Sequence, residues 1–201
     1  MTNHTPDAAV EARIDARIHE QLDYWIAQLA RLCAQPSISA QRLGIEECAA
    51  LVATMLAEQG YASEILPTGG SPIVYGDSGA AGQARTLLFY NHYDVQPPEP
   101  LDLWNSPPFT LTRVGDQLFA RGVSDDKGQL IIRMAAAAAV RDVLGALPCR
   151  VKFFVEGEEE VGSPNIPPAI DAHKDRFAAD GCVWEFGGVD YTGRPTQTLG
   201  M

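Results

Sequence analysis

Basic residues and long apolar runs are both scarce in this sequence. Its 201 residues include 15 Lys and Arg against 26 Asp and Glu, which gives a formal net charge of −11 at pH 7. Binding to nucleic acid requires a basic surface, so this balance argues against a nucleic-acid partner. The longest apolar candidate, residues 130–140, is mostly alanine and contains Arg133, so it is too short and too polar to span a membrane. We therefore expect neither nucleic acid nor membrane as a partner.

Paired cysteines and a glycine-rich fingerprint are also missing. No two cysteines have CxxC spacing, which argues against a disulfide framework and against a cysteine-liganded zinc site. We expect all four to be reduced and mostly buried: Cys33, Cys48, Cys149 and Cys182. No GxGxxG motif follows the first predicted strand, which excludes the usual dinucleotide-binding domain. The first residues lack the basic region and apolar core of a signal peptide, so the expected location is cytoplasmic.

The sequence does have the composition of an ordinary globular domain, with 46% hydrophobic and 20% charged residues. Apolar residues at three- and four-residue steps predict helices over 8–32, 44–59 and 126–147. Short apolar runs predict strands at 62–66, 73–75, 86–90, 151–155 and 182–184, and a hairpin over 110–120. Residues 193–201 resemble the beginning of another strand. Because helices and strands alternate, the expected fold class is α/β, with a mainly parallel sheet flanked by helices.

Chemically active side chains follow the predicted strands at the positions where an α/β protein places its ligands. His92 and Asp94 come directly after strand 86–90, so the imidazole could bind a metal while the carboxylate orients the ring. An ordinary polar strand end has the same pattern. Asp125 and Asp126 lie at the start of the helix predicted over 126–147, where they could cap the helix. Alternatively, Asp125 could bridge two metal ions through its two carboxylate oxygens.

Two further acidic positions complete the candidate set. The run Glu156-Gly157-Glu158-Glu159-Glu160 begins where strand 151–155 ends. Its like charges repel each other and a cation would offset that cost, although a solvated acidic loop has the same composition. Glu185 follows strand 182–184 between aromatic and glycine residues, a setting in which a carboxylate needs a partner. Together these histidine and carboxylate side chains are the nitrogen and oxygen ligands that suit zinc and other divalent first-row metals.

Four motifs resemble the M20 metallopeptidase family in order and spacing: residues 91–97, 104–109, 118–128 and 156–163. That family includes carnosinase-like dipeptidases, glutamate carboxypeptidases, aminoacylases and succinyl-diaminopimelate desuccinylase. The resemblance implies that residues 1–201 are the N-terminal part of the catalytic domain. It also implies that the chain ends before a lid domain, which in relatives contributes substrate contacts and homodimerisation. By this resemblance, the chain is expected to be a fragment of a longer enzyme.

The resemblance also assigns a ligand set. His92 and Glu185 would hold a first zinc ion, Asp125 would bridge both ions, and Glu160 would hold the second. Co2+ or Mn2+ could replace the two Zn2+ ions. The peptide bond between Asp125 and Asp126 would be cis, as in relatives.

The reaction implied is hydrolysis of an amide bond in a dipeptide, short peptide or N-acyl amino acid. Glu159 would be the general base that takes a proton from the metal-activated water, and Asp94 would orient His92. A slip of one residue would instead make Glu158 the base, but Gly162-Ser163 favours the first register. The alternative is a metal-binding module without catalytic activity, or an inactive fragment.

The sequence departs from the family pattern in two respects, a late histidine and the lid domain, and leaves the substrate open. Relatives supply a late histidine to the second zinc, and the remaining histidines, all expected at the surface, do not replace it: His4, His19 and His173. We therefore expect this chain to hold the second zinc weakly and to hydrolyse little. A glutamate at 185 is more typical of carboxypeptidase-like or acylase-like members, whereas residues 94–97 and 104–109 look more like the dipeptidase branch.

Overall fold

A six-stranded sheet forms the centre of the computed structural model, which describes residues 7–79, 82, 84–189, 192 and 195–200. The strand order is β1-β2-β6-β3-β7-β8. The strands are β1 (Ala62–Leu66), β2 (Ile73–Asp77), β3 (Thr86–His92), β6 (Arg150–Glu156), β7 (Gly181–Val189) and β8 (Pro195–Gly200). Strands β6, β3 and β7 are parallel, whereas the other neighbouring pairs are antiparallel. The predicted α/β class is confirmed, and its parallel part is the centre of a mixed sheet.

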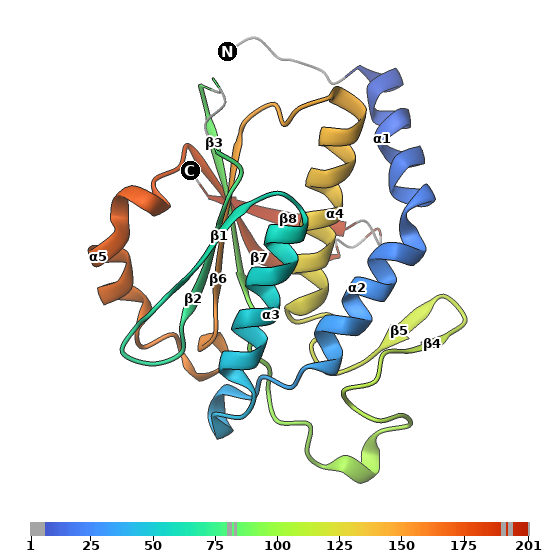
Figure 1. The fold of residues 1–201 in the computed structure, drawn as a ribbon. Coiled ribbons are helices and arrows are strands. Elements are labelled where there is room, and N and C mark those ends of the chain that lie inside the picture. Colours follow the sequence, from blue (N-terminus) through green and yellow to red (C-terminus); the bar gives the residue numbers. More distant parts are fainter. Residues whose placement is uncertain (1–6, 80–81, 83, 190–191, 193–194, 201) are drawn as a thin grey trace.

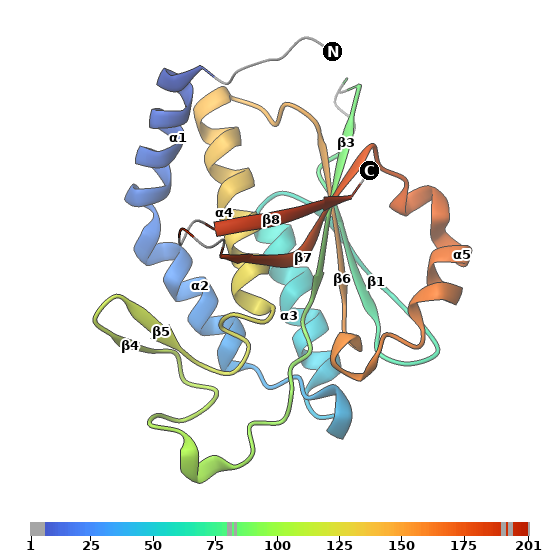
Figure 2. The same ribbon diagram turned by 180° about the vertical axis from the view of Figure 1, so that it is seen from behind.

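Helices cover both faces of this sheet (Figures 1 and 2). One face carries α1 (Ala8–Glu20), α2 (Leu22–Ala34), α3 (Ile45–Glu58) and α4 (Lys127–Leu144), and the other carries α5 (Ile166–Phe177). Short 3-10 turns lie at η1 (Ser39–Gln41), η2 (Leu101–Leu103) and η3 (Glu159–Val161). The predicted hairpin is present as β4 (Thr112–Val114) and β5 (Gln117–Phe119), outside the main sheet.

Three predicted elements differ in extent. The helix expected over 8–32 is two helices, because Gln21 leaves helical geometry with φ −101° and ψ 6°. The helix expected to end near 147 ends at Leu144, because Gly145 adopts the left-handed conformation that closes it, with φ 81°. Strand β7 continues to Val189 instead of stopping at 184. It pairs with β8, which confirms the strand predicted near the end of the sequence.

Strand β6 carries the core on both of its faces. Val151, Phe153 and Val155 pack into the larger cluster with the helices α2, α3 and α4. Phe154 points the other way, into a smaller cluster that includes Phe177 of α5. Side chains alternate along a strand, so a central strand covered by helices on both faces must be apolar at successive positions. The packing of β6 on both faces therefore fixes the position of the acidic residues at its carboxyl end.

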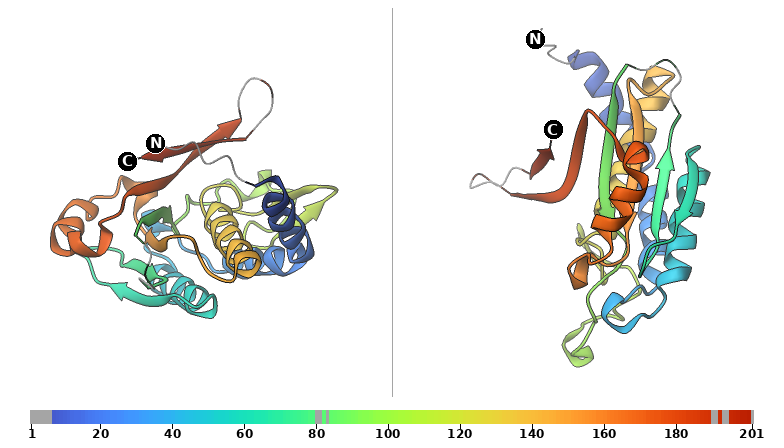
Figure 3. Two further views of the ribbon diagram at one scale, coloured as in Figure 1. Left: turned by 90° about the horizontal axis from the view of Figure 1, so that it is seen from above. Right: turned by 90° about the vertical axis from the view of Figure 1, so that its left-hand side faces the viewer.

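Beyond its first residues, β7 leaves the main sheet. It pairs with β3 only from Gly181 to Val183. Its pairing with β8 covers Cys182 and Val183 and resumes from Gly187 to Val189 after a register shift. Figure 3 shows the β7–β8 ribbon projecting from the rest of the fold. The sequence predicts Glu185 after the end of a strand. In the structure it lies within β7, where this strand begins to leave the main sheet.

Among the described residues, none of the helices combines the length and the apolar character that crossing a bilayer would require. The described cysteines form no disulfide: Cys33 and Cys48 are buried, and Cys149 and Cys182 are half-buried. His19 is exposed as expected, whereas His173 is half-buried with its ring against Phe177. His4 lies outside the described residues.

An ion pair joins two strands at one end of the sheet. Arg150 of β6 donates through Nε and Nη2 to the carboxylate of Asp77 on β2, with Nε 2.9 Å from Oδ1. Arg150 therefore lowers the pKa of Asp77 from its ordinary 3.8 to about 2, despite partial burial. Because the unfolded chain takes up the proton first, this interaction stabilises the fold above about pH 4 and is lost as the pH falls through about 2.

We expect Asp77→Asn to have a lower free energy of unfolding than wild type at pH 6. The difference between the two proteins should become progressively smaller below pH ~4. Urea unfolding of wild type and variant across this pH range measures the effect. Glu64→Gln is the matched control, because the Glu64–Arg176 pair is exposed and should contribute little. A difference between wild type and Asp77→Asn that does not change with pH would contradict the assignment.

Candidate metal centre

The side chain of His92 is the centre of the candidate site. It is the last residue of β3 and is fully buried. Its Nε2 atom lies 2.9 Å from Oδ1 of Asp125 and 3.4 Å from Oε2 of Glu185. Oε2 of Glu159 is 3.9 Å from the same nitrogen. Three carboxylates from three separate segments therefore converge on one imidazole nitrogen.

The other ring nitrogen of His92 faces Asp94. Nδ1 is 3.0 Å from the backbone oxygen of Asp94 and 3.3 Å from its Oδ1 atom. The Asp94 carboxylate, itself fully buried, also accepts the backbone N–H groups of Glu159 and Glu160 at 3.2 and 3.1 Å. Asp94 thus joins the loop after β3 to the loop after β6. These contacts hold both the imidazole ring and the acidic turn in place, as the orienting role requires.

Asp125 and Asp126 have different surroundings although they are adjacent. The peptide bond between them is cis, as the resemblance implies. The Asp125 side chain is 72% exposed apart from its contact with His92. Asp126 is buried, and its Oδ2 atom accepts the Asn91 side-chain amide at 2.7 Å and the backbone N–H of His92 at 2.9 Å. Asp126 occupies the N-cap position of α4 without a side-chain capping bond, so its carboxylate supports the end of β3 instead.

The four glutamates at and after the end of β6 point in different directions. Glu159 faces His92, whereas Oε2 of Glu160 accepts a hydrogen bond from the Gln96 amide at 2.8 Å. Glu156 is buried, and its Oε1 atom accepts the hydroxyl groups of Tyr90 and Ser163. The structure therefore places Glu159 with the His92 cluster and places Glu160 against Gln96.

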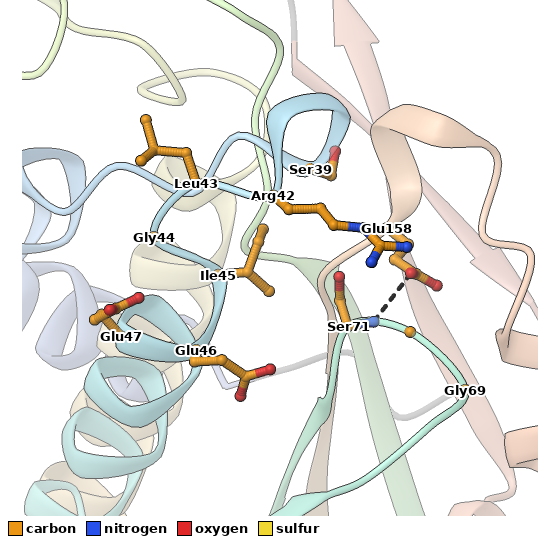
Figure 4. Close-up of a pocket in the computed structure, with 11 residues that line it drawn as sticks. Ser39, Arg42, Leu43, Gly44, Ile45, Glu46, Glu47, Gly69, Ser71 and Glu158 are labelled. Carbon is orange, nitrogen blue, oxygen red and sulfur yellow. Dashed lines mark hydrogen bonds between the residues drawn. The ribbon is translucent and has the colours of Figure 1, made fainter.

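Glu158 points away from the cluster, toward a separate cavity of about 530 Å³. Figure 4 shows its carboxylate accepting the backbone N–H of Ser71, at 2.9 Å. The other oxygen accepts the Asn165 amide at 2.8 Å. Arg42 and Glu46 also line this cavity (Figure 4). With both oxygens occupied by structural hydrogen bonds, Glu158 is poorly placed to act on a water near His92.

Asp126 is a potential ligand that sequence reasoning treated only as a helix cap. One donor atom each of His92, Asp126 and Glu185 lie within 4.8 Å of one another, and all three residues are buried. Oδ1 of Asp126 and Oε2 of Glu185 are buried without a hydrogen-bond partner. Buried polar atoms are normally paired, so these two oxygens are suited to a cation. The adjacent acidic residues were visible in the sequence, but which of the two is buried depends on the fold.

The charge of the cluster is strongly unbalanced toward carboxylates. Burial raises the pKa of Glu185 to about 7 and that of Asp126 to about 6. Burial lowers the pKa of His92, but hydrogen bonds to Asp125 and Asp94 outweigh this effect and raise it to about 11. The same bond to His92 lowers the pKa of Asp125. Imidazole nitrogen and carboxylate oxygens in such a cluster fit a zinc-type divalent cation.

Lys127 holds the Asp125–Asp126 segment against the rest of the fold. Its side chain is fully buried, and Nζ donates to the backbone oxygens of Leu32 at 3.1 Å and Gln35 at 2.6 Å. These carbonyls lie at the end of α2, where a helix leaves its last backbone acceptors unpaired. One side chain therefore satisfies that helix end and fixes the start of α4, next to the candidate ligands.

The fold and this cluster define an α/β protein with a candidate metal centre at the carboxyl ends of its central parallel strands. Residues 88–196, more than half of the chain, match the sequence profile of "Peptidase family M20/M25/M40". The chain belongs to this peptidase family.

Two similar proteins of established name are dipeptidases. The human Beta-Ala-His dipeptidase is 33% identical over 82% of this chain and 30% of its own length. The Cys-Gly metallodipeptidase of Schizosaccharomyces pombe is 33% identical over 83% of this chain and 38% of its own length. The chain thus spans about a third of the length of these relatives.

Two solved structures share the fold closely. An M20 family metallo-carboxypeptidase from Sulfolobus solfataricus superposes with a TM-score of 0.79 and 36% identity, over 85% of this chain and 39% of the other. Human carnosine dipeptidase 1 superposes with a TM-score of 0.80 and 27% identity, over 92% of this chain and 43% of the other.

We expect Lys127→Met to lower the free energy of unfolding by about 2–5 kcal/mol, because two hydrogen bonds from a buried ammonium group would be lost at about 1–3 kcal/mol each. Chemical unfolding followed by circular dichroism measures the loss. Lys174→Met on the exposed side of α5 is the matched control and should change stability by no more than ~0.5 kcal/mol. Equal effects for the two variants would contradict the structural role given to Lys127.

Proposed function

We propose that this protein is a metal-dependent hydrolase that cleaves an amide bond in a dipeptide, short peptide or N-acyl amino acid. The observation that carries the proposal is the convergence of Asp125, Glu159 and Glu185 on Nε2 of His92. Repulsion among carboxylates brought together around one buried imidazole would be costly without a cation between them. Membership of a peptidase family supports the same conclusion.

The proposed cofactor is a pair of Zn2+ ions, with Co2+ or Mn2+ as substitutes. His92 and Glu185 would hold the first ion, Asp125 would bridge the two, and Glu160 would hold the second. Asp125 is favoured over Asp126 as the bridge because it contacts Nε2 directly, while Asp126 already accepts two hydrogen bonds. The role of Glu160 requires its carboxylate to exchange its bond with Gln96 for the cation.

When bound, the two ions would polarise the amide carbonyl and lower the pKa of a water molecule. Glu159 would accept the proton of that water and pass it to the nitrogen of the leaving amine. Burial raises the pKa of Glu159, which makes this carboxylate a better base. Asp94 would hold the Glu159 backbone in position through the hydrogen bond at 3.2 Å, and would keep the His92 ring oriented.

Dipeptides are the first substrates to test. The relatives at 33% identity are named for Beta-Ala-His and Cys-Gly. A relative at 30% identity from Paracidovorax citrulli is named succinyl-diaminopimelate desuccinylase, which keeps N-acyl amino acids in the proposed substrate class. The similar Sulfolobus structure is a metallo-carboxypeptidase. Glu185 favours the carboxypeptidase-like or acylase-like members, whereas residues 94–97 and 104–109 favour the dipeptidase branch. The proposal therefore covers both.

Several features of the whole protein stay predictions. These are the assignment of residues 1–201 to the N-terminal part of a catalytic domain, the homodimer through a lid domain, and the cytoplasmic location. Among the described residues, no histidine besides His92 contacts the carboxylate cluster. We therefore propose that the 201-residue chain on its own holds the second ion weakly and hydrolyses little.

We expect Glu159→Gln to lower kcat by about 10²–10⁴-fold in the zinc-loaded full-length protein while its metal content is retained, because the amide cannot accept a proton. Steady-state hydrolysis of β-Ala-His, Cys-Gly and an N-succinyl amino acid, with metal content measured by plasma emission, tests this. Glu158→Gln is the matched control and should change kcat by less than about tenfold.

A larger loss of activity in Glu158→Gln than in Glu159→Gln would show that the base is assigned to the wrong glutamate. A full-length wild-type protein that binds zinc but hydrolyses none of these substrates would favour a metal-binding module without catalytic activity.

A further inference from the structure

Arg133 occupies a position that the proposed chemistry leaves unexplained. It lies on α4 and is 5% exposed, although arginine is seldom buried without a partner. Its guanidinium group donates to two backbone oxygens, Nη1 to Tyr90 and Nη2 to Trp184, each at 2.5 Å. One side chain therefore joins β3 to β7 from the helical layer.

The two carbonyls lie at the point where the sheet opens. Pairing between β3 and β7 stops at Phe89 and Val183, whereas pairing between β3 and β6 continues to His92 and Glu156. Tyr90 and Trp184 are the next residues of the two separating strands, and their rings stack with centroids 4.0 Å apart. Arg133 donates a hydrogen bond to the carbonyl of each of these residues, in the fixed geometry of a planar fork.

The separation of the strands matters for the candidate ligand that follows it. If the β3–β7 register continued, Glu185 would lie level with Asn91, one residue short of His92. Instead β7 turns away from β3, and Oε2 of Glu185 lies 3.4 Å from Nε2 of His92. Arg133 holds the residue immediately before Glu185, so it sets the point from which this carboxylate extends.

Charge supports the same arrangement. Arg133 interacts electrostatically with Asp126 and Glu185, two of the buried carboxylates of the cluster. A neutral donor could bond to the two carbonyls but would lose this favourable interaction with the two carboxylates.

We infer that Arg133 is a positioning residue for the first metal site: by joining Tyr90 and Trp184 across the opening between β3 and β7, it places Glu185 to bind the same cation as His92. This inference rests on the proposed function, because it requires Glu185 to be a metal ligand. It predicts that loss of Arg133 weakens metal binding without removing any ligand.

The test uses Co2+ as the probe, by titration of the metal-free protein with the visible absorption of the bound ion as the signal. We expect Arg133→Met to weaken cobalt binding by roughly 10- to 100-fold and to alter the spectrum, as losing a residue that orients a ligand does. Arg133→Lys should lose less affinity, because an ammonium keeps the charge but not the fork. Thermal unfolding of each metal-free variant shows whether it is folded.

Two further variants make the outcome decisive. Arg141→Met is the matched control, because Arg141 also lies on α4 and donates to a backbone oxygen, that of Gln59 at 2.6 Å, away from the cluster. It should lower thermal stability and leave cobalt binding unchanged. Glu185→Gln tests the proposed function separately, and wild-type cobalt binding in this variant would overturn the ligand role itself.

If Glu185→Gln weakens cobalt binding but Arg133→Met is folded and binds cobalt as wild type does, the inference about Arg133 is wrong while the metal site stands. If Arg133→Met does not fold, Arg133→Lys decides: wild-type affinity and spectrum in the folded lysine variant would overturn the inference.

Discussion

The structure depends on the convergence of several acidic side chains on one buried imidazole. His92 has no exposed surface, yet carboxylates from the start of α4, from the turn after β6 and from β7 all lie within 3.9 Å of its Nε2 atom. Burial raises the pKa of Glu185 to about 7, and repulsion from the neighbouring carboxylates acts in the same direction. Such a cluster persists only if the surrounding fold holds it or a cation neutralises it.

The surrounding fold supplies its part through hydrogen bonds that connect separate segments. Asp94 joins the loop after β3 to the turn after β6, and Asp126 holds the end of β3 from the start of α4. Lys127 holds that start against the end of α2. Each bond is made by a fully or almost fully buried side chain, Asp94, Asp126 or Lys127, so each is costly to break. His92 and the Asp125–Asp126 segment are therefore positioned before any ion binds, as an effective metal site requires.

Much of this arrangement could be predicted from the sequence, because its signals are local. The strand 86–90 is apolar and is followed by His92, and the glutamate run begins where strand 151–155 ends, so the strand-end positions were visible. The direction in which each of these side chains points could not be predicted from the sequence. Neighbouring glutamates 158, 159 and 160 face Ser71, His92 and Gln96 respectively, which depends on the turn η3. Likewise, Glu185 was expected after a strand, but β7 continues past it because β8 provides a new partner.

The central claim is that His92, Asp125 and Glu185 share a cation. Diffraction from zinc-soaked crystals, recorded on both sides of the zinc absorption edge, locates the ion directly. The account predicts an anomalous peak about 2.0–2.2 Å from Nε2 of His92 and from carboxylate oxygens of Asp125 and Glu185. A fully loaded protein with its zinc bound elsewhere, and no peak at His92, would contradict it.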